Sequence, residues 1–246
     1  AVELPKRVVD LAGRQKAECG ASFQYANYQA TREAFWAAHD LADRLRQLGQ
    51  YAVPLVDLDP DSTDRFMTYI SRLSDLRAQA PFAAATGLGD LGKNGMLMTP
   101  QFGPRQRLAF VVTSAAWPVS VAKTPAASPC PADCSACLQS CPVEALSSPA
   151  TEEVRITTTQ SYPVFARHET RCQWARCLGM VEGEGAGLLG WKVPGGEIPE
   201  KLDQEAWEKA RARKDPIQVR CYQNPNHSDT LIERCLQACP LGKGNC

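Results

Sequence analysis

The stretch that decides the fold covers residues 130–142 and reads Cys130-Pro-Ala-Asp-Cys134-Ser-Ala-Cys137-Leu-Gln-Ser-Cys141-Pro142. Its cysteines are separated by three, two and three residues, and the last one stands directly before a proline. A second stretch much later in the chain repeats the final spacing and the proline, as Cys235-Leu-Gln-Ala-Cys239-Pro240. Thiolates spaced this closely on tight turns converge, so the two stretches predict a fold built around metal centres.

The first stretch is nearly the bacterial ferredoxin pattern C-x2-C-x2-C-x3-C-P, with one extra residue in its first gap. In that pattern three cysteines bind one iron–sulfur cube, and the cysteine before proline binds the other cluster. Two x3-C-P endings suit a two-cluster protein in which each motif gives its last cysteine to the other motif's cluster. The sequence therefore predicts a protein that transfers electrons.

Disulfides and zinc are the competing uses of these thiols. The chain has 11 cysteines in 246 residues, and an odd, bunched set in a chain of this length is not typical of a disulfide framework. Zinc is the stronger alternative, because four thiolates with C-x2-C spacing bind it equally well. The repeated x3-C-P ending, with apolar helix-like segments after Pro142 and before Cys235, favours iron–sulfur clusters.

Charge and hydropathy argue against several partners. Lys+Arg and Asp+Glu both total 27, so the chain has no net positive charge that would attract nucleic acid or an anionic membrane. No apolar stretch is long enough for a transmembrane segment. No hydrophobic segment follows Ala1, and an export signal could have been removed. We therefore expect a cytoplasmic protein.

Periodicity outside the cysteines predicts a mixture of helices and strands. Apolar residues spaced by three and four predict an amphipathic helix over 26–48, and residues 51–56 and 108–113 predict strands, the second of them buried. Further helical segments are expected from Ser62 or Thr63 to about Leu76, and up to Ala85.

The second half of the chain is less regular. Residues 118–133 are rich in Pro, Ala and Ser and predict a boundary between two domains. A glycine-rich excursion is expected over 183–196 and a charged surface helix over 202–213. The segments Gly87–Gly92 and Gly185–Gly190 match G-x-G-x-x-G, but neither follows a predicted strand, so we expect no nicotinamide cofactor.

The first glycine segment belongs to a longer stretch, Gly87-Leu-Gly-Asp-Leu-Gly-Lys-Asn-Gly-Met-Leu-Met-Thr-Pro-Gln-Phe-Gly-Pro-Arg105. It resembles the segment before the cluster motif in corrinoid-dependent iron–sulfur reductases, namely the reductive dehalogenases and the epoxyqueuosine reductases. The order of helix, glycine loop, strand and cysteines agrees with this family. His168-Glu-Thr-Arg-Cys172-Gln-Trp174 also looks like the dehalogenase segment with a lone cysteine. The resemblance covers about residues 26–242.

The resemblance implies an α+β fold of two domains. A nitroreductase-like α/β sandwich over 1–120 would bind cobalamin, and a ferredoxin-like domain over 121–246 would hold two [4Fe-4S] clusters. An external low-potential donor of the ferredoxin or flavodoxin type would supply electrons, and cobalamin would reduce a small-molecule substrate. Family members carry a substantial segment before the helix that starts here at Ala26. We therefore expect either that the chain is a fragment with a truncated first domain, or that its corrin pocket is reduced, completed by a partner chain or empty.

The resemblance also divides the cysteines between the clusters. The cluster nearer the corrin would take Cys130, Cys134, Cys137 and Cys239. The other cluster would take Cys141, Cys172 and Cys235. Its fourth ligand is open, because Ile232 stands where the family has a cysteine. Cys221 is the first substitute, Cys177 the second and Cys246 the third, and a non-thiolate ligand is a further alternative.

Corrin contacts are implied for residues of the glycine loop, because a backbone without Cβ atoms can approach a flat macrocycle closely. These residues are Gly87, Gly89, Gly92, Asn94, Gly95 and Pro100. Lys93 matches a cation near the substrate in dehalogenases and could stabilise a departing anion, or it is an exposed loop lysine. Tyr28, with Tyr25 as the alternative, matches the dehalogenase proton donor, or it packs in the core.

Two other functions compete with a dehalogenase-like reductase. An epoxyqueuosine-reductase-like enzyme would use an aspartate before the glycine loop. Asp75 is the candidate there, but the family's V-D-T motif and a tRNA-binding extension are missing, so we expect no nucleic acid partner. The other alternative is a dicluster electron carrier, or a cobalamin-reducing protein, with no substrate chemistry of its own.

Overall fold

The computed structural model describes residues 1–12, 17–55, 76–116, 128–141, 143–156, 160–168, 171–172 and 234–242, with residue 158 and a few positions between 203 and 212. Within these ranges, the side chains of 11–12, 17–25, 28, 76–78 and 147–150 are outside the description. The predicted helix from Ser62 or Thr63 to Leu76, most of the 118–133 boundary and the glycine-rich excursion over 183–196 also lie outside it.

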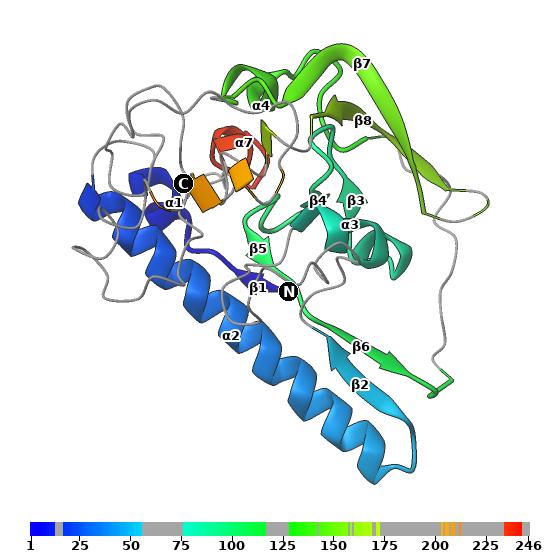
Figure 1. Ribbon diagram of the computed structural model, residues 1–246. Coiled ribbons are helices and arrows are strands. Elements are labelled where there is room, and N and C mark those ends of the chain that lie inside the picture. Colours follow the sequence, from blue (N-terminus) through cyan, green and yellow to red (C-terminus); the bar gives the residue numbers. More distant parts are fainter. Residues whose placement is uncertain are drawn as a thin grey trace.

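The helix α2 (Ala17–Gln47) runs along one side of the molecule (Figure 1). It confirms the predicted amphipathic helix over 26–48 and begins earlier. Its buried positions follow helical spacing and carry mostly small side chains: Asn27, Ala30, Ala34, Ala38, Ala42 and Leu45. Gly49, with φ +80°, ends it and donates its N–H to the carbonyl of Arg46. Glycine adopts this left-handed conformation without strain.

Within the residues that the structure describes, the strands form four separate antiparallel pairs. The pairs are β1 (Val2–Glu3) with β5 (Gln106–Arg107), β2 (Ala52–Leu55) with β6 (Phe110–Thr113), β3 (Asp90–Leu91) with β4 (Leu97–Met98), and β7 (Leu146–Arg155) with β8 (Ser161–Arg167). The predicted strands at 51–56 and 108–113 are confirmed as β2 and β6.

Two predictions from the sequence are wrong, one about the burial of a strand and one about a helix-like segment. β6 is not buried: Val112 is 59% exposed and lies opposite Val53, which is 55% exposed. An apolar run cannot tell whether a further layer covers a strand, and this face of the β2–β6 pair is open to solvent. The helix-like segment expected after Pro142 is instead a turn that leads into β7 at Leu146.

The other labelled helices are short. They are α1 (Lys6–Ala12), α3 (Leu76–Ala85), α4 (Ala136–Gln139) and α7 (Arg234–Ala238). The end of α3 at Ala85 confirms the predicted end of a helix there. In the predicted 202–213 helix, the described residues after Asp203 are helical and largely exposed, and Lys209 and Glu205 form an ion pair.

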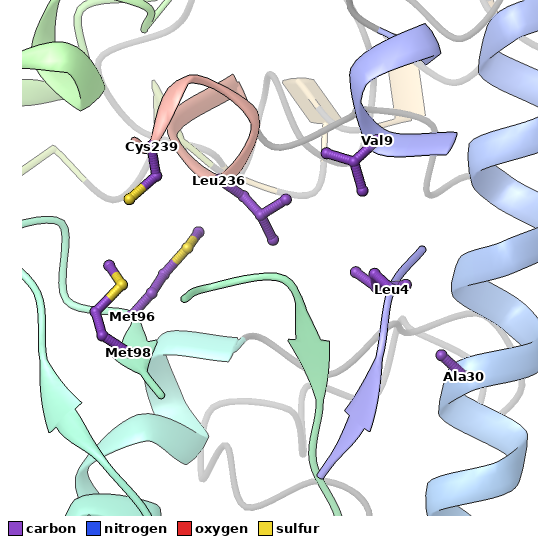
Figure 2. Packing of buried hydrophobic residues seen from close by; sticks show 7 residues of the cluster. All are labelled: Leu4, Val9, Ala30, Met96, Met98, Leu236 and Cys239. Carbon is purple, nitrogen blue, oxygen red and sulfur yellow. The ribbon is translucent and has the colours of Figure 1, made fainter. Parts of the chain in front are cut away.

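Two hydrophobic cores join early and late parts of the chain. The first combines Leu4, Val9, Ala30, Met96, Met98, Leu236 and Cys239, and Figure 2 shows Leu236 of α7 between Val9 and the two methionines. The second packs Tyr162 of β8, 0% exposed, against residues of α3, β3 and β4. Both cores therefore contain residues from either side of residue 120, where the sequence suggested a boundary.

Candidate metal centre

The predicted glycine loop is a helix end followed by a β-hairpin. At the end of α3, the N–H of Gly87 donates to the carbonyl of Ala84 and the N–H of Leu88 to that of Ala83. Gly87 has φ +76°, so this is a Schellman helix cap with glycine in its usual place. The first glycine of the motif thus ends a helix, which agrees with the absence of a dinucleotide-binding strand before it.

The hairpin is formed by β3 and β4, and Lys93 and Asn94 lie at its tip. The N–H of Gly95 donates to the carbonyl of Gly92, and the side-chain oxygen of Asn94 accepts from the N–H of Met96. Asn94 is 4% exposed, so its side chain fixes the turn from within.

The other residues with predicted corrin contacts also lie in or next to this hairpin. A Cβ on Gly89 would come within 2.4 Å of the carbonyl oxygen of Met98, whereas one on Gly92 would meet side-chain atoms, with Met98 Cε at 2.3 Å and Asn94 Oδ1 at 3.2 Å. Pro100 lies exposed in the turn after β4. Close packing within the chain already requires glycine at Gly89, and corrin binding by this loop stays a prediction.

Lys93 connects the hairpin to the first cysteine stretch. Its backbone N–H donates to the sulfur of Cys130 at 3.3 Å. Its ammonium donates to the carbonyl oxygens of Pro131 and Ala132 at 2.8 and 2.6 Å, and of Cys134 at 3.4 Å. The Lys93 ammonium, predicted to be a cation near the substrate, therefore lies on the backbone of the cysteine loop.

The four thiols assigned to the cluster nearer the corrin are neighbours in space. Burial, the nearby Cys130 and then the nearby Cys134 raise the pKa of the Cys137 thiol to about 11. Burial also raises the pKa of Cys239, and Cys130 and Cys134 act on it in the same direction. Cys137 and Cys239 each interact with Cys130 and Cys134, so these four cysteines form one group, which we call the first thiol group. Metal binding here must release protons.

Arg105 holds the segment that carries Cys239. Its guanidinium donates to the carbonyl oxygens of Leu241 at 2.8 Å, Gln237 at 3.0 Å and Cys239 at 2.9 Å. The residue is 1% exposed, and burial lowers its pKa while Cys239 and Asp10 oppose that shift. Arg105 ends the stretch that resembles the reductase family, but sequence reasoning gave it no role.

A close backbone contact supports the same segment. Gly103 has φ +55°, and a Cβ on it would lie 2.3 Å from the carbonyl oxygen of Leu241. Gly242 has φ +71°, and a Cβ on it would lie 2.3 Å from the carbonyl atoms of Phe102. Only glycine at both positions allows the two backbones to pack this closely.

The cysteines assigned to the other cluster are linked by backbone hydrogen bonds. The sulfur of Cys141 accepts from the N–H of Ala145 at 3.2 Å, and the carbonyl of Ala145 accepts from the N–H of His168 at 2.7 Å. The carbonyl of His168 accepts in turn from the N–H of Cys172 at 3.1 Å. Arg167 also approaches the sulfur of Cys172, at 4.0 Å.

Cys235 lies next to this region, since α7 packs against α4. The hydroxyl of Ser140 donates to the carbonyl of Arg234 at 3.3 Å, which joins the residue before Cys141 to the residue before Cys235. We call Cys141, Cys172 and Cys235 the second thiol group. The structure thus places Cys235 beside the region of Cys141, and the assignment of the cysteines to two clusters stays a prediction.

Several candidates lie outside the described residues. Cys221, Cys177 and Cys246, the alternatives for the fourth ligand of the second group, are among them. The backbone of Tyr28 is part of α2, but its side chain is not described, and the same holds for Tyr25. Asp75 also falls outside. The predictions for these residues stay predictions.

Three features are absent from the described part of the chain. None of its seven described cysteines forms a disulfide. Among the described residues, no three His, Cys, Asp or Glu side chains meet closely enough to hold one metal ion. No helix within the same part has the length and apolar character needed to cross a bilayer.

Comparison with known proteins gives a partial match. The chain is 37% identical over 76 residues to tetrachloroethene reductive dehalogenases from Desulfitobacterium hafniense and Dehalobacter restrictus. The match covers 31% of this chain and 11% of each relative. No protein-family model and no solved structure matches the chain significantly. Over this stretch, the chain is similar to reductive dehalogenases, as the glycine loop and the cysteines suggested.

Proposed function

We propose that this chain is an iron–sulfur reductase of the reductive-dehalogenase type. It would hold two [4Fe-4S] clusters that pass electrons from a low-potential donor to a cobalamin, which reduces a small organic substrate. The first thiol group carries this proposal, because residues far apart in the sequence supply its four sulfurs. The partial match to tetrachloroethene reductive dehalogenases also supports it.

The donors fit a [4Fe-4S] cube. Such a cube takes one thiolate on each of its four irons, so its ligands need not meet at one point as zinc ligands do. Cys137 and Cys239 are buried, whereas Cys130 and Cys134 are partly exposed. Backbone N–H groups already point at the sulfurs of Cys130 and Cys141, and such bonds tune the potential of a cluster.

The remaining parts of the proposal follow from the resemblance. A bound cobalamin would supply the chemistry of bond cleavage, on a nitroreductase-like fold that includes the glycine loop. Tyr28 is our proposed proton donor. The chain would hold the clusters and the corrin in place and exclude water between them.

Metal and cofactor analysis of the full chain tests this function. After purification without oxygen and reconstitution with iron and sulfide, we expect about eight iron and eight sulfide per chain. Extraction should release a corrinoid with a visible spectrum of its own. Iron and sulfide without corrinoid would instead favour an electron carrier, and zinc or colourless protein would contradict the proposal.

A further inference from the structure

Two basic side chains bind the two halves of the first thiol group in the same manner. Lys93 donates to carbonyls of residues 131–134, and Arg105 donates to carbonyls of residues 237–241. Both come from one short part of the chain, residues 93–105, that carries no cysteine. Each cation therefore holds the backbone around a cysteine.

The choice of main-chain oxygens matters for the chemistry. Lys and Arg donate hydrogen bonds and accept none, so they satisfy carbonyls that a tight turn or helix end leaves unpaired. Gln237 lies in α7, and Cys239 and Leu241 follow its end, where the helix dipole favours a positive charge. The sulfur atoms remain available to iron while the loops that carry them are fixed.

We propose that Lys93 and Arg105 are positioning residues that clamp the two cysteine segments of the first thiol group onto the 93–105 segment, and that Arg105 is the main clamp of Cys239. The inference rests on the proposed function, because it concerns the ligands of that cluster. It assigns Lys93 to the cysteine loop and not to the substrate. Arg105 is almost fully buried and uses a planar fork for three carbonyls, so another cation cannot replace it fully.

The chain provides a matched control for each clamp. Arg107 is also buried, at 4% exposure, but it donates to the side chain of Asn27 and the carbonyl of Gln106. Arg107→Gln thus removes a buried guanidinium that lies two positions after Arg105, on β5, and is hydrogen-bonded to Asn27 and Gln106. Lys209 lies on the surface and pairs with Glu205, so Lys209→Met controls for Lys93→Met.

Two measurements on the full chain test the clamps. The first is the rate at which a ferrous chelator removes iron from the reconstituted protein, where Arg105→Gln and Lys93→Met should each react roughly tenfold faster than their controls. The second is alkylation of individual cysteines by iodoacetamide before reconstitution, followed by mass spectrometry. Cys239, 5% exposed in the structure, should become reactive in Arg105→Gln, and Cys130 and Cys134 should become more reactive in Lys93→Met.

The two measurements separate this inference from the proposed function. If the unmodified chain binds no iron, the proposed function fails, and the alkylation pattern alone decides the clamps. Equal iron release and equal alkylation in Arg105→Gln and Arg107→Gln would overturn the role of Arg105, and equal results in Lys93→Met and Lys209→Met would overturn that of Lys93.

Arg105→Lys keeps the test valid if Arg105→Gln does not fold. This variant retains the positive charge but lacks the planar fork of the guanidinium. We therefore expect it to fold. Its iron release and Cys239 alkylation should be faster than in the unmodified chain and slower than predicted for Arg105→Gln. Values identical to the unmodified chain would show that charge alone suffices and would overturn the role given to the planar fork of Arg105.

Discussion

Tyr162 shows how one side chain ties β8 to the glycine hairpin. Its hydroxyl donates to the carboxylate of Asp90 at 2.8 Å and accepts from the side chain of Gln160 at 2.8 Å. Burial and then the bond to Asp90 raise the pKa of Tyr162 to about 12. The protonated phenol therefore stabilises the fold across the neutral range.

The pH dependence of this contribution can be predicted. Because the pKa of Tyr162 is higher in the folded chain than the usual value of about 10, its contribution is complete below pH 10 and is lost as pH rises toward 12. Tyr162→Phe should lower the free energy of unfolding at pH 7 by about 1–2 kcal/mol. Denaturant unfolding should show this difference shrinking between pH 10 and pH 12.

An absorbance titration supplies the control for this prediction. The chain has six tyrosines, and the phenolate signal of the unmodified chain should contain a late step that Tyr162→Phe lacks. If the two titrations coincide, or if the stability difference stays constant up to pH 12, the role given to the Tyr162–Asp90 bond is wrong.

At the scale of elements, the contact between the turn at Phe102–Gly103 and the segment after α7 should be sensitive to one methyl group. Gly103→Ala combines a left-handed backbone with a clash against the carbonyl of Leu241, and we expect a loss of about 3 kcal/mol in the free energy of unfolding. The segment with Cys239 should move outward, which faster alkylation of Cys239 would detect.

Gly49→Ala is the matched control for that variant. Gly49 has a similar φ of +80°, but a Cβ there would meet nothing within 4 Å. It should cost only about 1 kcal/mol, the conformational penalty by itself. Equal losses for the two variants in chemical denaturation would mean that the backbone contact contributes nothing.

The elements also show what could be predicted from the sequence. The spacing of Cys130, Cys134 and Cys137 predicted that these three thiols lie near one another, because spacing on a turn is a local property. The helix over 26–48 and the strand at 51–56 followed from periodicity for the same reason. The hairpin β7–β8 carried an alternating pattern too, with Tyr162 and Val164 buried on one face, and this signal was overlooked.

The role of Arg105 could not be predicted in this way. Its partners are main-chain oxygens 132 to 136 positions away in the sequence. Main-chain atoms are the same in every residue, so a contact with them leaves no pattern of side chains to find. The exposure of Val112 is a similar case, because the sequence of a strand does not reveal which layers cover it.

At the scale of the whole molecule, the first hydrophobic core packs N-terminal residues against the segment that carries Cys239. Leu4, 1% exposed, shares this core with Leu236 and Cys239. Leu4→Ala should lower the free energy of unfolding by about 3 kcal/mol, through lost burial and a cavity. It should also speed the removal of iron by a chelator, although Leu4 is remote from every cysteine of the group in the sequence.

Leu48→Ala is the comparison for this prediction. Leu48 is 75% exposed at the end of α2, so its truncation should change stability by no more than about 0.5 kcal/mol. Iron release that is unchanged in both variants would show that the core and the thiol groups are energetically separate.

The distance between Cys130 and Cys239 along the chain has a consequence for biosynthesis. A ribosome releases the N-terminal part of a chain first, so Lys93, Arg105 and three thiols of the first group emerge well before the fourth. A nascent chain that met an iron donor at that stage could offer only an incomplete set of sulfurs. If the proposed cluster forms, its full set of four thiols exists only after translation has passed Cys239, and Arg105 is then in place to bind that last segment.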